Sequence, residues 1–254
     1  MGSLDIALLL VAALFAGFVD AVAGGGGLIQ VPTLLVALPA ESPATVFGTN
    51  KLSSIFGTGN AAVRYARRIA LPWGVALPAA AMAFVCSFAG AAAVAWLPKE
   101  FVRPLVLVLL ALVLAYTVVR PEFGVAAGAR LSKDKERRLA VIAGAVLGFY
   151  DGFFGPGAGS FMIFAFVRWF RLDFLHASSA AKVVNLATNA AALAYFVPSG
   201  HVLWGIGLAM ATFNIAGALL GARLALRHGS SFVRGTFIVV ASLLICRLGY
   251  DTFF

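Results

Sequence analysis

The amino-acid sequence predicts an all-α integral membrane protein built as two inverted repeats, each a re-entrant helical hairpin followed by three transmembrane helices. Composition, a succession of apolar runs and an internal repeat lead to this prediction. Of the 254 residues, 62% are hydrophobic and 11% are charged, and the mean hydropathy is +0.99. A soluble domain carries about 25% charged residues. The chain therefore has more apolar surface than one soluble core can bury, and we expect a lipid bilayer around it.

The net charge of +9 is interpreted through membrane topology, because loops rich in Lys and Arg stay on the cytoplasmic side. In a soluble protein such a charge would suggest a nucleic acid as partner, and here we expect none. The two cysteines, Cys86 and Cys246, lie inside apolar runs and predict neither a disulfide framework nor a zinc site. The first 22 residues contain no Lys or Arg, which a secretory signal needs, so we expect a retained helix there.

Apolar runs along the chain set the expected order of the helices. A membrane span takes about 20 residues, and the two runs at 28–38 and 159–170 are too short. Each follows a glycine cluster, and such a break survives at membrane depth only where protein or a water-filled cavity satisfies the backbone. We therefore predict re-entrant hairpins over 4–38 and 139–170. Full spans are expected at 44–65, 70–97, 101–119, 174–197, 202–226 and 230–252.

The sequence repeats itself at an offset of 131 residues. Gly17-Phe18-Val19-Asp20 matches Gly148-Phe149-Tyr150-Asp151, and Lys51 matches Lys182, without a gap. The predicted units are a first repeat, a polar linker and a second repeat, at 1–119, 120–138 and 139–254. Because a hairpin plus three spans crosses the membrane an odd number of times, the second repeat is expected to be inverted relative to the first.

The basic residues favour one orientation in the membrane. With both termini outside, fourteen of the 19 Lys and Arg residues lie on the inner side and three lie outside. Cytoplasmic loops carry the excess of Lys and Arg, so we predict periplasmic termini and a cytoplasmic linker at 120–138. The other two basic residues, Lys51 and Lys182, fall within the membrane.

Lys51 and Lys182 are the leading candidates for a binding site, because each lies in an otherwise nearly uncharged helix. A charged side chain near the bilayer centre costs roughly 2.5–3.5 kcal/mol on insertion scales, so a functional role is the default hypothesis. We hypothesise that the lysines bind an anion. Two alternatives stay open: a structural ion pair with Asp20 or Asp151, and snorkelling of the lysine stem toward the membrane surface.

Asp20 and Asp151 end the long hairpin arms, directly before the glycine breaks. Each is a candidate for capping backbone amides, for pairing with a lysine, or for carrying a coupling proton. The short arms begin at the breaks, and the N-terminus of a helix presents free amides and a partial positive charge to an anion. The alternative is that the glycines serve close helix packing only. The candidate anion-binding residues at the breaks are Gly26, Gly27, Gly157 and Ala158.

Neutral polar side chains extend the candidate site along the two lysine helices. Lys182, Asn185 and Asn189 are spaced at i, i+3 and i+7, which places them on one helical face. Such side chains can donate hydrogen bonds to an oxyanion, or else hydrogen-bond between helices. The candidate donors are Asn50, Ser54, Asn185 and Asn189.

Other functions find less support in the sequence. No Gly-Lys-Ser or Gly-Lys-Thr follows either glycine cluster, so no nucleotide site is expected. No His-Glu cluster, and no nucleophile with a nearby base, lies among the spans, so we expect no enzyme, no metal and no cofactor. Gly217 and Gly221 have the GxxxG spacing that is typical of close helix packing.

Two segments of the chain resemble a known family. AGFVDAVAGGGGLIQVP at 16–32, followed by GTNKLSSIFGT at 48–58, is similar to the first repeat of the TauE/SafE family of membrane proteins, also called TSUP transporters. GFYDGFFGPGAGSF at 148–161, followed by the Lys182 helix, resembles the second repeat. The resemblance covers nearly the whole chain. It implies movement of sulfur-containing anions, such as sulfite, thiosulfate and sulfonates such as sulfoacetate, across the bacterial inner membrane.

The sequence thus predicts a secondary transporter that exports sulfite, an organosulfonate or thiosulfate by alternating access. A passive channel for small anions is the alternative, and its flux would neither saturate nor need a coupling ion. The expected partners are the small anion and the lipid bilayer, with a proton as candidate coupling ion. Because Ala181 stands where the first repeat has Asn50, the two half-sites are expected to be unequal. The direction of transport and the oligomeric state stay open at this point.

Overall fold

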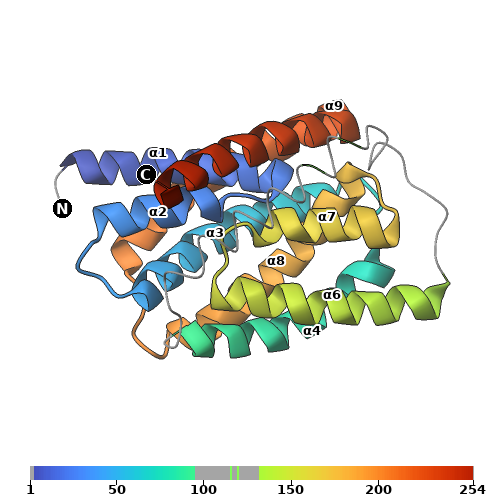
Figure 1. Cartoon of the computed structure of the whole chain (residues 1–254), viewed down its shortest axis with the longest axis horizontal. Coiled ribbons are helices and arrows are strands. Elements are labelled where there is room, and N and C mark those ends of the chain that lie inside the picture. Colours follow the sequence, from blue (N-terminus) through green and yellow to red (C-terminus); the bar gives the residue numbers. More distant parts are fainter. Residues whose placement is uncertain (1–2, 95–114, 116–118, 120–131, 254) are drawn as a thin grey trace.

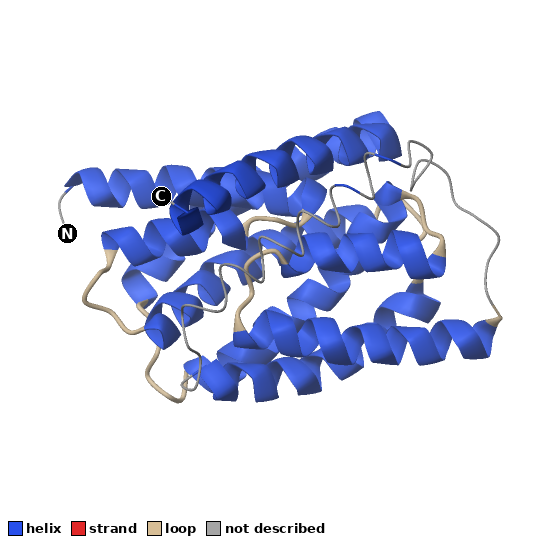
Figure 2. Ribbon diagram, viewed as in Figure 1, coloured by secondary structure: helices blue, strands red, loops and turns tan. Residues whose placement is uncertain are grey.

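The computed structural model describes residues 3–94, 115, 119 and 132–253, and this part of the chain consists of helices and loops without a strand (Figure 2). The expected span at 101–119 lies outside the described residues, apart from residues 115 and 119. The helices are α1 (Ser3–Ala23), α2 (Gly27–Ala37), α3 (Pro43–Ala66), α4 (Trp73–Ala93), α6 (Lys133–Phe153), α7 (Ala158–Phe170), α8 (Phe174–Phe196) and α9 (Trp204–Phe253).

Most helices begin and end within a few residues of the apolar runs, and α6 differs most. It begins at Lys133, so residues 133–138 of the expected linker form its first turns. Asp134 and Glu136 in that first turn interact favourably with the helix dipole, which explains why a charged segment is helical. The longest helix, α9, covers two expected spans. It is broken at Gly229, whose φ of 71° and ψ of −162° suit glycine alone.

Each hairpin turns at glycines with a left-handed backbone. Gly24 between α1 and α2 has φ 76°, and its counterpart Gly155 between α6 and α7 has φ 88°. Residues with a side chain are strained at such angles. The short arms α2 and α7 can therefore reverse direction within a few residues of the long arms.

The two lysine helices also start alike. Ser42 accepts a hydrogen bond from the amide of Thr45 (3.2 Å) before α3, and Asp173, 131 residues later, accepts one from the amide of His176 (3.0 Å) before α8. Asp173 also accepts from the hydroxyl of Ser230 (2.7 Å), next to the break in α9. Burial raises the pKa of Asp173, but the hydrogen bonds from His176 and Ser230 outweigh burial and lower it to about 2. The start of α8 is thus anchored to α9.

The helices form three layers in Figure 1. Along the top of the view α1 packs on α9, and along the bottom α4 packs on α6, while α3, α7 and α8 lie between these pairs. The residue numbers of α1, α3 and α4, increased by 131, fall in α6, α8 and α9. The contact between α1 and α9 therefore has its counterpart in the contact between α6 and α4. The contact between α3 and α9 has its counterpart in the contact between α8 and α4. The main pairings therefore occur twice.

The outer surface is apolar in the way that a membrane protein requires. Large side chains such as Leu8, Val85 and Val146 are exposed, whereas alanine and glycine are frequent between the helices. Within the described residues, three helical segments are long and apolar enough to cross a bilayer, namely Leu4–Ala23, Trp73–Ala93 and Trp204–Val239. The shorter apolar helices are α2 and α7. The chain is a multi-pass membrane protein.

Glycines of α9 allow its close approach to α1. A Cβ at Gly217 would overlap the carbonyl oxygen of Leu14, and one at Gly221 would lie 2.5 Å from the carbonyl oxygen of Phe18. Apolar helices gain little from leaving lipid, so their association depends on such close van der Waals contact. The expected packing role of this GxxxG pair is therefore visible in the structure.

We predict that Gly217→Ala lowers the stability of the detergent-purified protein, because the added methyl group meets the backbone of α1. Overpacking of this kind costs about 1–3 kcal/mol, which a lowered melting temperature would report. Gly205→Ala is the matched control, because Gly205 lies in the same helix with nothing within 4 Å of an added Cβ. Equal melting temperatures for the two variants would contradict the packing interpretation.

Candidate functional site

The two hairpin tips lie directly against each other. A Cβ at Gly24 would come 2.7 Å from the amide nitrogen of Ser160, and one at Gly27 would lie 3.4 Å from Cα of Pro156. The hydroxyl of Ser160 donates a hydrogen bond to the carbonyl oxygen of Ala23 (2.9 Å). The backbones at the two breaks are thus close neighbours, and glycine permits this proximity.

Both lysines are paired with the carboxylate of the opposite half of the chain. Nζ of Lys51 lies 2.8 Å from Oδ1 of Asp151, and Nζ of Lys182 lies 2.9 Å from Oδ2 of Asp20. The first pair joins α3 to α6, and the second joins α8 to α1. The ion-pair alternative considered for the lysines is therefore found in this structure, in a crossed arrangement that no sequence pattern specified.

A threonine hydroxyl completes the surroundings of each carboxylate. Thr58 donates to Oδ2 of Asp20 (3.1 Å), and Thr188 donates to Oδ2 of Asp151. Neither threonine was among the predicted site residues. Thr58 follows Lys51 by seven positions and Thr188 follows Lys182 by six. The spacing of seven returns to nearly the same helical face and could have identified Thr58, whereas the spacing of six lies about 120° away on the helix and could not have identified Thr188.

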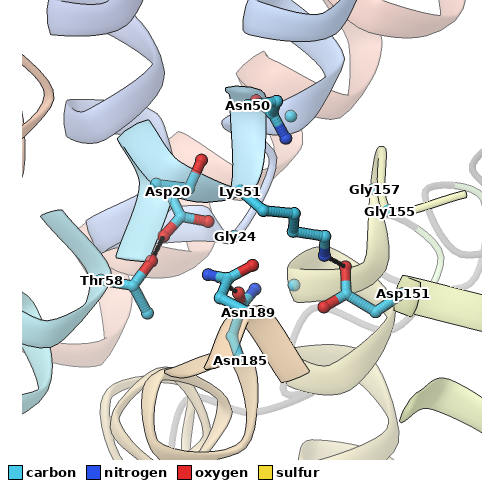
Figure 3. A pocket seen from close by; sticks show the side chains of 13 residues that line it. Asp20, Gly24, Asn50, Lys51, Thr58, Asp151, Gly155, Gly157, Asn185 and Asn189 are labelled. Atoms are coloured by element: carbon cyan, nitrogen blue, oxygen red, sulfur yellow. Dashed lines mark hydrogen bonds and ion pairs between the residues drawn. The ribbon is translucent and has the colours of Figure 1, made fainter. Parts of the chain in front are cut away.

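A small cavity lies between the hairpin tips and the two lysine helices (Figure 3). Its volume is about 20 Å³, little more than the roughly 10–15 Å³ that one water molecule needs. The ion-paired form therefore has space for water but not for an oxyanion of several heavy atoms. The predicted site residues that line the cavity are Asp20, Gly27, Asn50, Lys51, Ser54, Asp151, Gly157, Asn185 and Asn189.

Three predicted site residues do not line this cavity. The side chain of Lys182 is fully buried, and its ammonium also donates to the backbone oxygen of Asp20. Gly26 packs against α1, where an added Cβ would lie 2.5 Å from the carbonyl oxygen of Ala16. The amide of Ala158 already donates to the carbonyl oxygen of Gly155 (3.0 Å).

Side-chain amides supply the remaining polar groups of the cavity. Asn189 donates through Nδ2 to Oδ1 of Asn185 (2.9 Å), so these two residues orient each other. Oδ1 of Asn50 is buried without a hydrogen-bond partner, and leaving a buried polar atom unpaired costs about 1–3 kcal/mol. Rotation of the amide exchanges its oxygen and nitrogen. Asn50 thus has unused hydrogen-bonding capacity directed at the cavity.

These groups can bind an anion through an ammonium and neutral donors. The two lysines and two carboxylates balance each other when all four are ionised, so the cavity has no excess charge in this state. Among the residues that the structure describes, no group of three or more His, Cys, Asp or Glu residues is arranged to hold a metal ion.

We predict that Asp20→Ala lowers the melting temperature strongly, because it leaves Lys182 as a buried charge without its partner. Breaking a buried ion pair in this way costs about 3–5 kcal/mol. Adding Lys182→Met to the same chain should recover most of this loss, since the second change removes the charge. Glu41→Ala removes an exposed carboxylate between α2 and α3 and is the control. A loss no larger than that of the control would show that the pair is unimportant for stability.

The amino-acid sequence is similar to those of known membrane proteins. The sequence model of the family described as "Sulfite exporter TauE/SafE" matches residues 9–248. A probable membrane transporter protein, YfcA, of Escherichia coli strain K12 is 34% identical over 252 residues, covering 97% of this chain and 90% of its own length. A probable membrane transporter protein, ORF9, of Sinorhizobium sp is 34% identical over 251 residues, covering 97% and 93%.

A third relative, a probable membrane transporter protein of Haemophilus influenzae, is 31% identical over 262 residues, covering 98% of each chain. No solved structure matches the chain. The family match extends over both hairpins and both lysine helices, which contain all the cavity residues named above. The chain therefore belongs to the TauE/SafE family and is a membrane transporter.

Proposed function

We propose that this transporter moves small sulfur-containing oxyanions, exporting sulfite, an organosulfonate or thiosulfate across the bacterial inner membrane. The observation that carries the proposal is Lys51, a buried lysine that lines a cavity between two glycine breaks. Asn50, Ser54, Asn185 and Asn189 are its proposed hydrogen-bonding partners for the anion. The family description, which names sulfite, supports the choice among anions.

The size of the cavity supports alternating access over a passive channel. A channel that conducts an anion needs a continuous path wide enough for it, whereas this cavity has a volume of about 20 Å³. Entry of an oxyanion requires the hairpin tips to separate and the pair between Lys51 and Asp151 to open. A carrier passes through such a closed state between its two open ones.

The proposed architecture is a pair of inverted repeats related by a pseudo-two-fold axis in the membrane plane. The crossed ion pairs support it, because an axis between the repeats relates one pair to the other. So does the packing of the outer helices. Gly221 of α9 lies on the carbonyl oxygen of Phe18 in α1, and Gly90 of α4 lies on that of Phe149 in α6, at the same offset of 131.

The proposed topology has both termini in the periplasm and the linker in the cytoplasm. The basic residues support this orientation, as fourteen of 19 then lie inside. In Figure 1, α1 begins at the same end of the molecule at which α9 ends, while α6 begins at the opposite end. The long axis in the view would then run across the membrane.

We expect Lys51→Ala to abolish the thermal stabilisation of the purified protein by its anion. A ligand at 100 times its Kd stabilises by about 2.7 kcal/mol, and this shift should vanish with the ammonium. The measurement is a melting curve with sulfite, thiosulfate, methanesulfonate, sulfate or a carboxylate. Arg64→Ala removes a positive charge from the end of the same helix outside the cavity and is the control. Lys51→Arg should not fully restore binding, because a guanidinium is larger and planar. Equal stabilisation of Lys51→Ala and the parent would remove the basis of the proposal.

Labelling of single cysteines tests the topology. On a background without Cys86 and Cys246, Gly2→Cys should react with an impermeant thiol reagent in intact spheroplasts, because we place residue 2 in the periplasm. Ala129→Cys should react only after the membrane is opened, because the linker is placed in the cytoplasm. The reverse pattern would invert the topology, and labelling of both in intact cells would exclude an odd number of crossings in the first repeat.

A further inference from the structure

The two crossed ion pairs differ in their access to the cavity. Lys51 and Asp151 both line it, whereas Lys182 does not. The Lys182 side chain is 0% exposed, and its ammonium contacts both a carboxylate oxygen and the backbone oxygen of Asp20. Of the second pair only Asp20 lines the cavity, so a ligand in the cavity can meet the ammonium of Lys51 but not that of Lys182.

Asp151 occupies the position on Lys51 that a substrate anion needs. Its Oδ1 lies 2.8 Å from the Lys51 ammonium, and Oδ2 accepts a hydrogen bond from Thr188. A carboxylate and a sulfur oxyanion use the same acceptor chemistry toward an ammonium. In the closed form, the side chain of Asp151 thus takes the place of the transported anion.

Building on the function proposed above, we propose that an anion displaces Asp151 from Lys51 only together with one proton, which neutralises Asp151. The Lys182–Asp20 pair stays intact and positions the α1 tip. The proton comes from solvent and binds Oδ1, the oxygen that Lys51 releases, while Oδ2 keeps its hydrogen bond from Thr188. Before the exchange the ammonium is balanced by Asp151, and afterwards it is balanced by the anion, so the charge of the cavity is unchanged.

The burial of Asp151 is what links the two events. Its side chain is 3% exposed, and an ionised carboxylate that loses its partner at such a site is strongly unfavourable. The charge balance also selects the substrate, because a monoanion matches one ammonium and a dianion leaves one negative charge in excess. The preferred class is therefore a monoanion, such as a sulfonate or hydrogensulfite.

The other ionisable groups around Asp151 are already engaged. Across the cavity, Asp20 is held by Lys182 and Thr58. The neighbouring Tyr150 donates its hydroxyl to the carbonyl oxygen of Pro156 (2.8 Å). The ionisable residue of α4 is the half-buried Cys86, and the one of α7 is Arg168, at the end of α7 away from the break. We therefore assign the proton to Asp151, because it is the carboxylate that Lys51 releases when the anion binds.

The test measures the Kd of methanesulfonate, a monoanion that stays ionised across the neutral range, on the purified full-length protein at several pH values. Thiosulfate, a dianion, is the second probe. Uptake of one proton makes the Kd for methanesulfonate fall about tenfold for each unit by which the pH falls. In Asp151→Asn, which leaves Lys51 available at every pH, binding should be tighter than in the parent and independent of pH. The matched control is Glu41→Gln, which removes an exposed carboxylate outside the cavity and should keep the parent's slope. Asp20→Asn removes the other carboxylate that lines the cavity and tests the competing assignment of the proton.

A Kd that does not change with pH in the parent protein would overturn the proposal, and this result needs no variant to fold. If the pH dependence of the Kd disappears in Asp20→Asn but persists in Asp151→Asn, the proton binds Asp20 and not Asp151, and the proposal is overturned as well. Binding of thiosulfate without methanesulfonate would overturn the preference for a monoanion. If neither anion binds at any pH, the function proposed above fails, and this inference fails with it.

Discussion

Four charges buried among apolar helices have to neutralise one another, and much of the structure follows from how they do so. Removing an ion from water costs several kcal/mol even after relaxation, unless a partner and further hydrogen bonds compensate. Here Lys51 and Lys182 find their partners in the opposite half of the chain, at the ends of α6 and α1. Each half therefore completes the electrostatics of the other, and neither lysine helix is neutralised by its own hairpin.

Glycine makes these pairings possible, because the helices that hold the charges come close at their backbones. Gly24 turns the first hairpin with a positive φ and lies against Gly159 of the second. Gly217 and Gly221 bring α1 onto α9 in the same way. Carboxylates at the ends of α1 and α6 can then reach a lysine on another helix. The glycines therefore serve close packing, and Gly27 and Gly157 also line the cavity, while their binding of an anion stays a prediction.

The surroundings of the two lysines differ between the two halves of the chain. Asn50 beside Lys51 has unused hydrogen-bonding capacity at the cavity, and its counterpart beside Lys182 is Ala181, which has none. Lys182 in turn makes an additional contact with the backbone of α1. One lysine faces the cavity and the other anchors a hairpin tip.

The sequence by itself determined the membrane class, the order of most described helices, the glycine breaks and the candidate lysines. These features depend on local properties, namely apolar length, backbone freedom and the cost of a charge in lipid. The sequence could not determine which carboxylate pairs with which lysine. Asp20 and Asp151 have equivalent positions at the offset of 131 residues, and either pairing would neutralise both lysines. Nor could the sequence place Lys182 behind the cavity or remove the amide of Ala158 from the site. Those outcomes depend on how the hairpins cross, and only the tertiary structure decided them, since burial and partner choice are set by contacts between segments far apart in the chain.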